Sequence, residues 1–375
     1  MQAGADIACS GADGTPAWPL QAMSANDRTR RSTLERMPKW MICIPLACQW
    51  AWLALRYRSA TLPSAANPAI TAGGLVGEGK LEYFRGMGPV ARRATANHCA
   101  VVASAATSSA RLQQIMRQAG LRFPVIAKPD LGLCGYGVRL VADLAALRNY
   151  VNAFPAGETV VLQAYLPQTG EAGIFYARDP DSDHARIIGL ALRHFPQVVG
   201  DGANSIAELR AADLRLRRLH GSARHQAPAA STRVPAAGEV VRLATIGSTR
   251  VGGLYRDGGA CITPQLLAAI DAVARDMPDF YCGRFDVRFD SIDALAAGRG
   301  FTIMEINGAG SEAIEAWDPD IGVLRGLRMI FAKQRTLFAI GAALRKRGVV
   351  PIGLLALARL NRRQQRLIAL YPPSN

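Results

Sequence analysis

The sequence predicts a mixed α/β (α+β) protein with at least two lobes. Half of its 375 residues are apolar and only 19% are charged, which excludes a disordered or collagen-like chain. From residue 121 onward, short apolar runs typical of strands alternate with segments of helical periodicity, and two of those runs are close enough in sequence to pair as antiparallel neighbours. This alternation argues against a helical bundle or a β-sandwich.

The first part of the chain differs in composition from the rest. Residues 1–36 lack periodicity, so we interpret them as a disordered leader or a mis-called start, with Met23 and Met37 as alternative initiators. The sixteen uncharged residues 40–55 span about 24 Å as a helix, which is short for a transmembrane helix, and Pro45 is expected to interrupt it. Three tryptophans and flanking cations favour an interfacial or re-entrant segment, with a buried core helix as the alternative.

The elements of the remaining chain are expected in a regular order. A helix ends near residue 119, and strands follow at 123–129 and 158–166 with a helix at 142–154 between them. Further strands are expected at 173–179, 185–195 and 240–247. An amphipathic helix at 263–277 precedes two strands at 283–290 and 301–308.

The net charge of +15 is concentrated at the two ends of the chain. Residues 321–375 carry 11 basic and no acidic side chains, and residues 1–60 carry 7 basic and 4 acidic ones, so the middle is nearly neutral. Aromatic residues are not interleaved with the basic runs, which argues against nucleic-acid binding. The seven cysteines show no zinc spacing and suit a reducing, cytoplasmic compartment, and the five histidines form no Ser/His/Asp pattern.

The last two expected strands carry the strongest chemical signal. Alternation places Arg284 and Asp286 on one face of the first strand and Glu305 and Asn307 on one face of the second. Antiparallel pairing would bring the two carboxylates and the amide oxygen together, and these are ligands suited to Mg²⁺ against nucleotide phosphates. The adjacent Arg284 can neutralise charge that develops during transfer. The alternative is a solvated strand face with an ordinary ion pair.

A second signal lies where the strand ending at Lys128 enters a glycine-rich turn. Gly132, Gly135 and Gly137 would let backbone N–H groups close around phosphate oxygens, and Lys128 adds a positive charge. Neither a GxGxxG fingerprint nor a Walker loop is present there. Residues 74–80 read GLVGEGK, but Leu81 stands where a Walker loop needs Ser or Thr, so a P-loop is rejected.

In this order and spacing, the motifs PVIAKPDLGLCGYG, GRFDVRFD and IMEING resemble those of the ATP-grasp superfamily, most closely its D-alanine:D-alanine ligase and amino-acid ligase branch. The resemblance covers roughly residues 75–320. It implies an ATP-grasp fold, in which two α+β lobes sandwich the nucleotide, here with helical N- and C-terminal additions. It also implies an ATP-dependent carboxylate-amine ligase that acts through an acyl phosphate and releases ADP and phosphate.

The resemblance also implies roles for individual residues. Lys80 and Lys128 would contact ATP phosphates, the glycine loop would close over them, and Arg284 would stabilise the reaction centre. The adenine would lie along the strand that carries Gln163, Tyr165 and Leu166, and Glu171 would hold the ribose. Asp286, Glu305 and Asn307 would bind two Mg²⁺ (or Mn²⁺) ions.

Two departures from the branch remove any D-alanine specificity. A Trp-rich segment stands in place of the N-terminal substrate domain, and GAGSEAIEAWDP follows Asn307 in place of a Pro/Gly turn. Ser311 and Glu312 are placed to meet an acceptor. The stretch 196–250, with Arg210, Arg215, Arg217 and Arg218, is a candidate lid, and a solvated helix face is the alternative.

The chain is thus expected to have five segments and small-molecule partners. The segments are a leader (1–36), a Trp-rich helix and connector (37–79), an N-terminal lobe with the glycine loop (80–165), a C-terminal lobe with the metal site (166–325) and a basic amphipathic helical tail (326–375). A carboxylate and an amine are the expected substrates, and residues 40–55 and 326–375 are candidates for peripheral contact with an anionic membrane. A kinase-like or ATP-binding module and a membrane-associated scaffold remain the alternatives.

Overall fold

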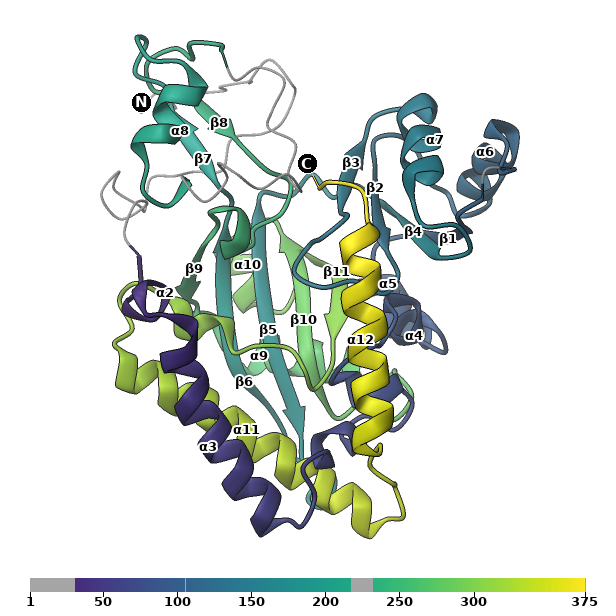
Figure 1. The fold of residues 1–375 in the computed structure, drawn as a ribbon, viewed down its shortest axis with the longest axis vertical. Helices are drawn as coiled ribbons and strands as arrows, with labels where there is room; N and C mark the ends of the chain where they lie inside the picture. Colours follow the sequence, from purple (N-terminus) through teal and green to yellow (C-terminus); the bar gives the residue numbers. More distant parts are fainter. Residues whose placement is uncertain (1–30, 105, 217–231, 375) are drawn as a thin grey trace, which may run out of the picture.

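The computed structural model describes residues 31–104, 106–216 and 232–374. In these residues the two larger of three antiparallel sheets, each with helices packed on it, are joined by residues 165–169 (Figure 1). The mixed α/β class expected from the sequence is therefore confirmed.

The N-terminal lobe contains a four-stranded sheet with the order β1-β4-β2-β3. Its strands are β1 (His98–Val102), β4 (Thr159–Ala164), β2 (Val125–Pro129) and β3 (Arg139–Val141). Helices α6 (Ser109–Gln118) and α7 (Leu144–Ala153) pack on this sheet through Leu112, Met116 and Leu147. The short strand β3 was not predicted, because three residues are too few for a recognisable alternation.

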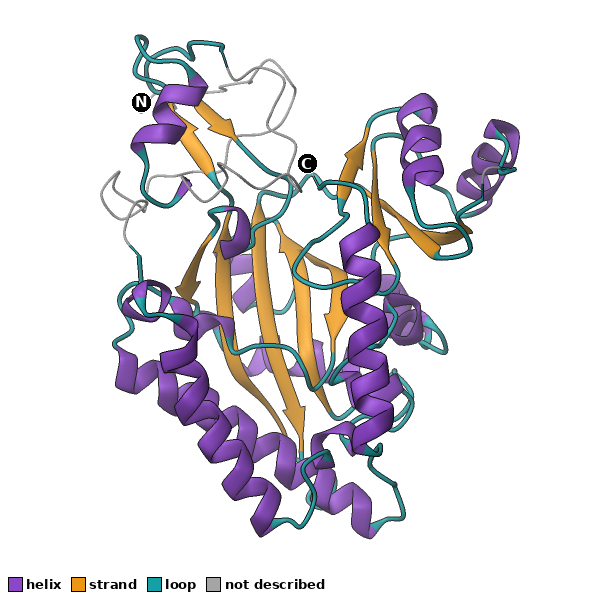
Figure 2. Ribbon diagram, viewed as in Figure 1, coloured by secondary structure: helices purple, strands orange, loops and turns teal. Residues whose placement is uncertain are grey.

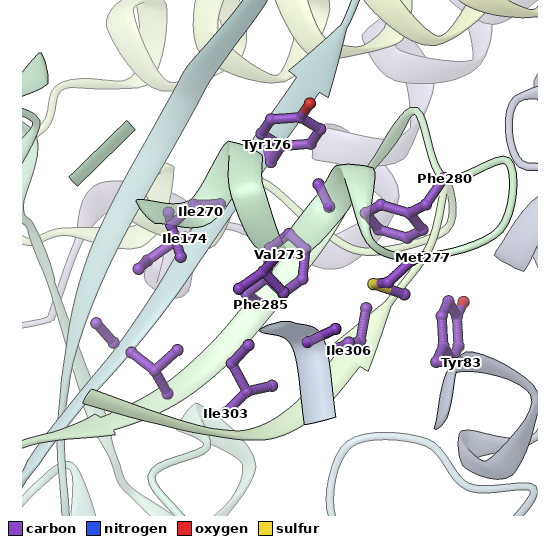
Figure 3. Close-up of a cluster of buried hydrophobic side chains, with 14 of the residues drawn as sticks. Tyr83, Ile174, Tyr176, Ile270, Val273, Met277, Phe280, Phe285, Ile303 and Ile306 are labelled. Carbon is purple, nitrogen blue, oxygen red and sulfur yellow. The ribbon is translucent and has the colours of Figure 1, made fainter. Parts of the chain in front are cut away.

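The C-terminal lobe contains a five-stranded sheet with the order β11-β10-β5-β6-β9. Its strands are β11 (Phe301–Asn307), β10 (Cys282–Phe289), β5 (Gly170–Arg178), β6 (Ala185–His194) and β9 (Leu254–Asp257). Helix α9 (Pro264–Arg275) starts from the N-cap Thr263 and covers one face of the sheet. Figure 3 shows Ile270 and Val273 of α9 among the strand side chains of this core. The apolar side chains of the sheet thus point to α9, and the opposite face is free to carry polar groups.

Smaller elements complete the two lobes (Figure 2). They are α4 (Lys80–Phe84), α5 (Pro89–Ala94) and α10 (Ile292–Ala296), and the 3-10 turns η2 (Leu62–Ala65), η3 (Thr71–Gly74), η5 (Thr249–Val251), η6 (Gly259–Cys261) and η7 (Ile314–Trp317). Strands β7 (Gln197–Val199) and β8 (Val240–Arg242) form a separate ribbon with α8 (Ile206–Ala212). The strand expected at 240–247 is therefore shorter than predicted. Of the candidate lid, Arg217 and Arg218 lie outside the described residues.

The helices at the two ends of the chain lie against the lobes (Figure 1). They are α2 (Thr33–Arg36), α3 (Lys39–Arg56), α11 (Val323–Lys346) and α12 (Leu354–Leu370). Helix α11 buries Leu337, Ile340 and Leu344 beneath the sheet, so the expected basic tail is largely a packed part of the body. None of the helices in the described ranges is long and apolar enough to cross a membrane.

Two expectations for the N-terminal part are corrected. Pro45 does not interrupt α3, because one missing hydrogen bond is tolerated in a helix that packs on α11, where Gln49 donates to the carbonyl of Phe331 (2.8 Å). Helical structure also reaches into the expected leader, because Ser32 and Glu35 form a capping box that starts α2. Residues 1–30 lie outside the described residues.

Candidate functional site

A cavity of about 460 Å³ opens between the two sheets, and all but one of the predicted site residues line it. They are Lys80, Lys128, Gly132, Gly135, Gln163, Tyr165, Leu166, Glu171, Arg284, Asp286, Glu305 and Asn307. The exception is Gly137, where a side chain would meet Pro129 and Tyr371. Residues spread over more than 220 positions of the chain are thus brought to one site.

The two interior lysines both lie within the electrostatic influence of Glu305, but only Lys80 is paired with it. The Nζ atom of Lys80 lies 3.3 Å from Oε1 of Glu305, and Nζ of Lys128 donates to Oε1 of Gln163 (2.8 Å) and to the carbonyl of Met304 (2.8 Å). Burial lowers the pKa of Lys128 to about 8, although Glu305 acts to raise it. An anionic group entering this cavity would meet both ammonium groups and would favour the charged form of Lys128.

Glycines allow the loop between β2 and β3 to lie close to the lysines. A Cβ at Gly132 would meet Nζ of Lys80 at 2.8 Å, and a Cβ at Gly135 would meet Ile246 at 2.9 Å. Gly135 also has φ +73°, a conformation that favours glycine. The positive φ therefore favours glycine at 135, and a side chain at 132 would displace the ammonium group of Lys80.

The strand pair β10 and β11 is antiparallel, as predicted, with Asp286 opposite Glu305 and Arg284 opposite Asn307. Asp286 is completely buried, and Arg284 donates to both of its oxygens (Nε to Oδ1 2.6 Å, Nη2 to Oδ2 3.0 Å). Burial alone would raise the pKa of Asp286, but Arg284 and Arg193 outweigh it and keep that pKa below its usual value. Asp286 is therefore a carboxylate in the centre of the site.

Arg193 of β6 is a site residue that the sequence analysis missed. Its Nη1 atom lies 3.1 Å from Oε1 of Glu171 and 3.2 Å from Oδ2 of Asp286. It reaches Asp286 of β10 across strand β5, which lies between β6 and β10. No local motif marks Arg193, and only the order β10-β5-β6 brings it to the site.

Glu171 is buried and paired on both of its oxygens. Besides Arg193, it contacts Nε of Arg288 at 3.3 Å from Oε2, and Arg288 lies directly opposite it on β10. In this structure the carboxylate that was expected to hold ribose is an acceptor for two arginines. The amide Nε2 of Gln163, by contrast, is buried with no hydrogen-bond partner among the described residues.

The donor set partly fits a divalent cation. Glu305 and Asn307 offer oxygen atoms to the cavity, and these are ligands that Mg²⁺ prefers. Asp286 would have to share its oxygens with Arg284 and Arg193, and Asn307 donates to it through Nδ2 (3.3 Å). Within the described residues, no group of three or more His, Cys, Asp or Glu side chains is placed to hold a metal.

Two further parts of the cavity lining carried no sequence signal. Glu78 lies beside the lysines, where burial raises its pKa to about 7 and leaves Oε2 without a hydrogen-bond partner in the described part of the chain. Helix α12 adds Asn361, Gln364 and Gln365. Gln364 donates to the carbonyl of Gly132 (3.1 Å) and thereby fastens the glycine loop to the C-terminal helix.

Ser311 and Glu312, which were expected to meet the acceptor substrate, also line the cavity. The hydroxyl of Ser311 donates to the carbonyl of Gly308 at 2.8 Å. This bond fixes the turn after β11 against the site.

The sequence matches no family model and no curated protein. Among solved structures, the chain is similar to a bifunctional glutathione synthetase from Pasteurella multocida, with 17% identity and a TM-score of 0.34 over 68% of this chain and 35% of that chain. It is also similar to the D-cycloserine synthetase DcsG, with 12% identity and a TM-score of 0.36 over 72% of this chain and 69% of that chain. A third similar structure is an ADP complex of N5-carboxyaminoimidazole ribonucleotide synthetase, with 13% identity and a TM-score of 0.33 over 64% of this chain and 46% of that chain.

These matched structures are ATP-grasp enzymes, the superfamily that the sequence motifs resemble. The chain spans about a third of the glutathione synthetase and about half of the ribonucleotide synthetase. All three TM-scores lie below 0.5, which is too low to infer a function from these structures. A function is therefore inferred from the site residues of this chain alone.

Proposed function

We propose that the chain is an ATP-grasp enzyme that joins a carboxylate to an amine at the expense of ATP. The observation that carries this proposal is the convergence of two lysines, a glycine loop and the Arg284/Asp286 and Glu305/Asn307 pairs on one cavity between two antiparallel sheets. Phosphoryl transfer needs positioning and charge compensation more than a side-chain nucleophile, and this cavity offers both.

Each group would have a defined task. The phosphates of ATP would lie between Lys80, Lys128 and the loop at Gly132, with the adenine along Gln163, Tyr165 and Leu166 and with Glu171 toward the ribose. Glu305, Asn307 and Asp286 would hold Mg²⁺ or Mn²⁺, which when bound neutralises phosphate charge.

Arg284 would stabilise the charge that builds up when the substrate carboxylate attacks the γ-phosphate and ADP leaves. The acyl phosphate would then be captured by the amine, and phosphate would be released as the amide bond forms. The substrates are small molecules whose identity the cavity residues do not specify.

ADP release in the presence of pools of amino acids and small carboxylates tests this function. We expect turnover with at least one pool, and loss of at least a hundredfold of it in Glu305→Gln, because that change removes a charge shared by Lys80 and the metal. Asp290→Asn, which changes an exposed carboxylate at the end of β10 outside the cavity, is the matched control. Undiminished turnover in Glu305→Gln would overturn the metal assignment, and ADP release without an amide product would favour the kinase-like alternative.

We also propose that α3 makes a peripheral contact with the cytoplasmic face of an anionic membrane. Trp40, Ile44, Trp52 and Leu55 are exposed on this helix, and Arg56 follows them. Sedimentation with vesicles of anionic lipid should fall at least fivefold in a Trp52→Ser, Leu55→Ser double variant, and should be weak with neutral vesicles. Equal sedimentation of the variant and the unchanged chain would exclude α3 as the contact.

A further inference from the structure

A second cavity, of about 430 Å³, lies on the same face of the five-stranded sheet as the first. One wall is Phe175 of β5, which lies directly opposite Arg284 in the neighbouring strand. The turn at Ala313 and Glu315 separates the two cavities, because Ile314 lines the first and its two neighbours line the second. Helix α11 forms the remaining wall. The second cavity is therefore adjacent to the proposed reaction centre without being part of it.

The most unusual residue of this cavity is Lys333 of α11. Its side chain is 92% shielded from solvent, yet it makes no hydrogen bond or ion pair within the described part of the chain. Its ammonium lies 4.5 Å from the ring centre of Phe175, a cation–π contact. Burying a charge costs more than one such contact returns, so the lysine is incompletely compensated.

Glu315, which also lines the cavity, is buried and forms no ion pair among the described residues. Its carboxylate occupies the space that a side chain at Gly189 would fill, since a Cβ there would lie 2.2 Å from Oε1. Glu315 and Lys333 do not form an ion pair with each other. Burial raises the pKa of Glu315 to about 7, and burial, together with the nearby Arg284, lowers that of Lys333 to about 7.

The rim of the cavity is positively charged. Arg186, Arg325 and Arg328 line it, and of these Arg186 donates to Thr336 (3.2 Å) and Arg325 pairs with Asp257 (3.1 Å). The only acidic side chain in the lining is Glu315, so the lining as a whole favours an anion. A cavity with a buried ammonium group inside and cationic side chains at its entrance is the arrangement expected of an anion-binding pocket.

We infer that this second cavity binds a small molecule through a carboxylate or phosphate group placed against Lys333. The bound anion would supply the partner that the lysine lacks, and the ring of Phe175 would pack against the rest of the ligand. Arg284 lies close enough to act on the charge of Lys333. An anion bound there would therefore also relieve repulsion on the proposed reaction centre.

Direct titration of the full-length chain with succinate and with inorganic phosphate, in the absence of nucleotide, tests the inference. We expect saturable binding of at least one probe, at least tenfold weaker binding in Lys333→Met, and recovery in Lys333→Arg. Arg335→Met is the matched control, because Arg335 is exposed on the same helix and does not line the cavity. A thermal unfolding curve confirms that each variant is folded.

Absence of saturable binding for both probes up to 20 mM, or equal affinity in Lys333→Met, would overturn the inference. Because nucleotide is left out, these results do not depend on the proposed ligase activity. Adding the bound probe to the ADP-release assay then shows whether the anion is a substrate of the proposed reaction or a separate ligand. A substrate raises ADP release in proportion to its own consumption, whereas a separate ligand alters the rate without being consumed.

Discussion

The two cavities on one face of the C-terminal sheet differ in how their buried charges are compensated. In the first cavity, Asp286 and Glu171 are held by Arg284, Arg193 and Arg288, and Lys80 faces Glu305. In the second, Lys333 and Glu315 are buried without an ion pair in the described chain. Apart from Glu78 and Lys128, which form no ion pair in the described chain, the charges of the first cavity thus hold one another in place, which positions reactive groups before a ligand arrives. In the second cavity, the buried ionisable groups would gain a charged partner only when a ligand binds.

This difference has opposite consequences for stability. Breaking a buried ion pair leaves an uncompensated charge and is strongly destabilising, whereas removing a charge that never had a partner relieves a cost. Substitutions in the two cavities should therefore change the free energy of unfolding in opposite directions.

The largest effect is expected from Arg193→Met. It removes one of the two arginines on Glu171 and one of the two on Asp286, so the free energy of unfolding should fall by about 3–5 kcal/mol. Urea denaturation measures this change. The control is Arg363→Met, whose exposed pair with Glu158 should contribute less than about 1 kcal/mol. Similar losses in the two variants would mean that the network of the first cavity is not especially stabilising.

The same contrast explains which parts of the site the sequence could predict. Arg284, Asp286, Glu305 and Asn307 could be found because one antiparallel strand pair with a short connection contains them, and alternation then fixes their common face. Arg193 could not, because its role depends on β6 lying beside β5 and on its side chain reaching across β5 to Asp286 of β10. Non-local pairing of this kind leaves no local pattern.

For the C-terminal tail (326–375), the sequence likewise predicted the helices but not the surface on which they pack. Its apolar stripe and arginines predicted a helical tail, and the structure has α11 and α12 with a break at residues 347–353 between them. The sequence does not show which surface the stripe packs against. It therefore could not predict that Lys333 is buried whereas Arg335, two residues later, is exposed. The continuity of α3 through Pro45 was missed for a related reason, since packing on α11 decides it, whereas β3 was missed because three residues are too few to show an alternation.

A smaller effect, opposite in sign, is expected from Glu315→Gln in the second cavity. Burial raises the pKa of this carboxyl from 4.5 to about 7, so the folded state holds its proton more tightly than the unfolded state does. The stabilisation from this group is complete below pH 4.5 and is lost as the pH rises to about 7. At pH 8 the glutamine variant should therefore be more stable than the unchanged chain, by at most about 3 kcal/mol for 2.5 pKa units.

The gain should disappear near pH 4.5, and this pH dependence separates a relieved charge from a general packing effect. Lys333 also has a pKa of about 7, so its own titration must be separated from that of Glu315. The effect of Glu315→Gln on unfolding is therefore measured twice, once in the unchanged chain and once in a chain that carries Lys333→Met. A gain of equal size at pH 4.5 and pH 8 would show a packing effect instead of a relieved charge, and a loss at pH 8 would show that the carboxylate has a partner in the folded state. In that case the second cavity would be as fully compensated as the first, and the reason to expect an anion beside Lys333 would rest on the lysine alone.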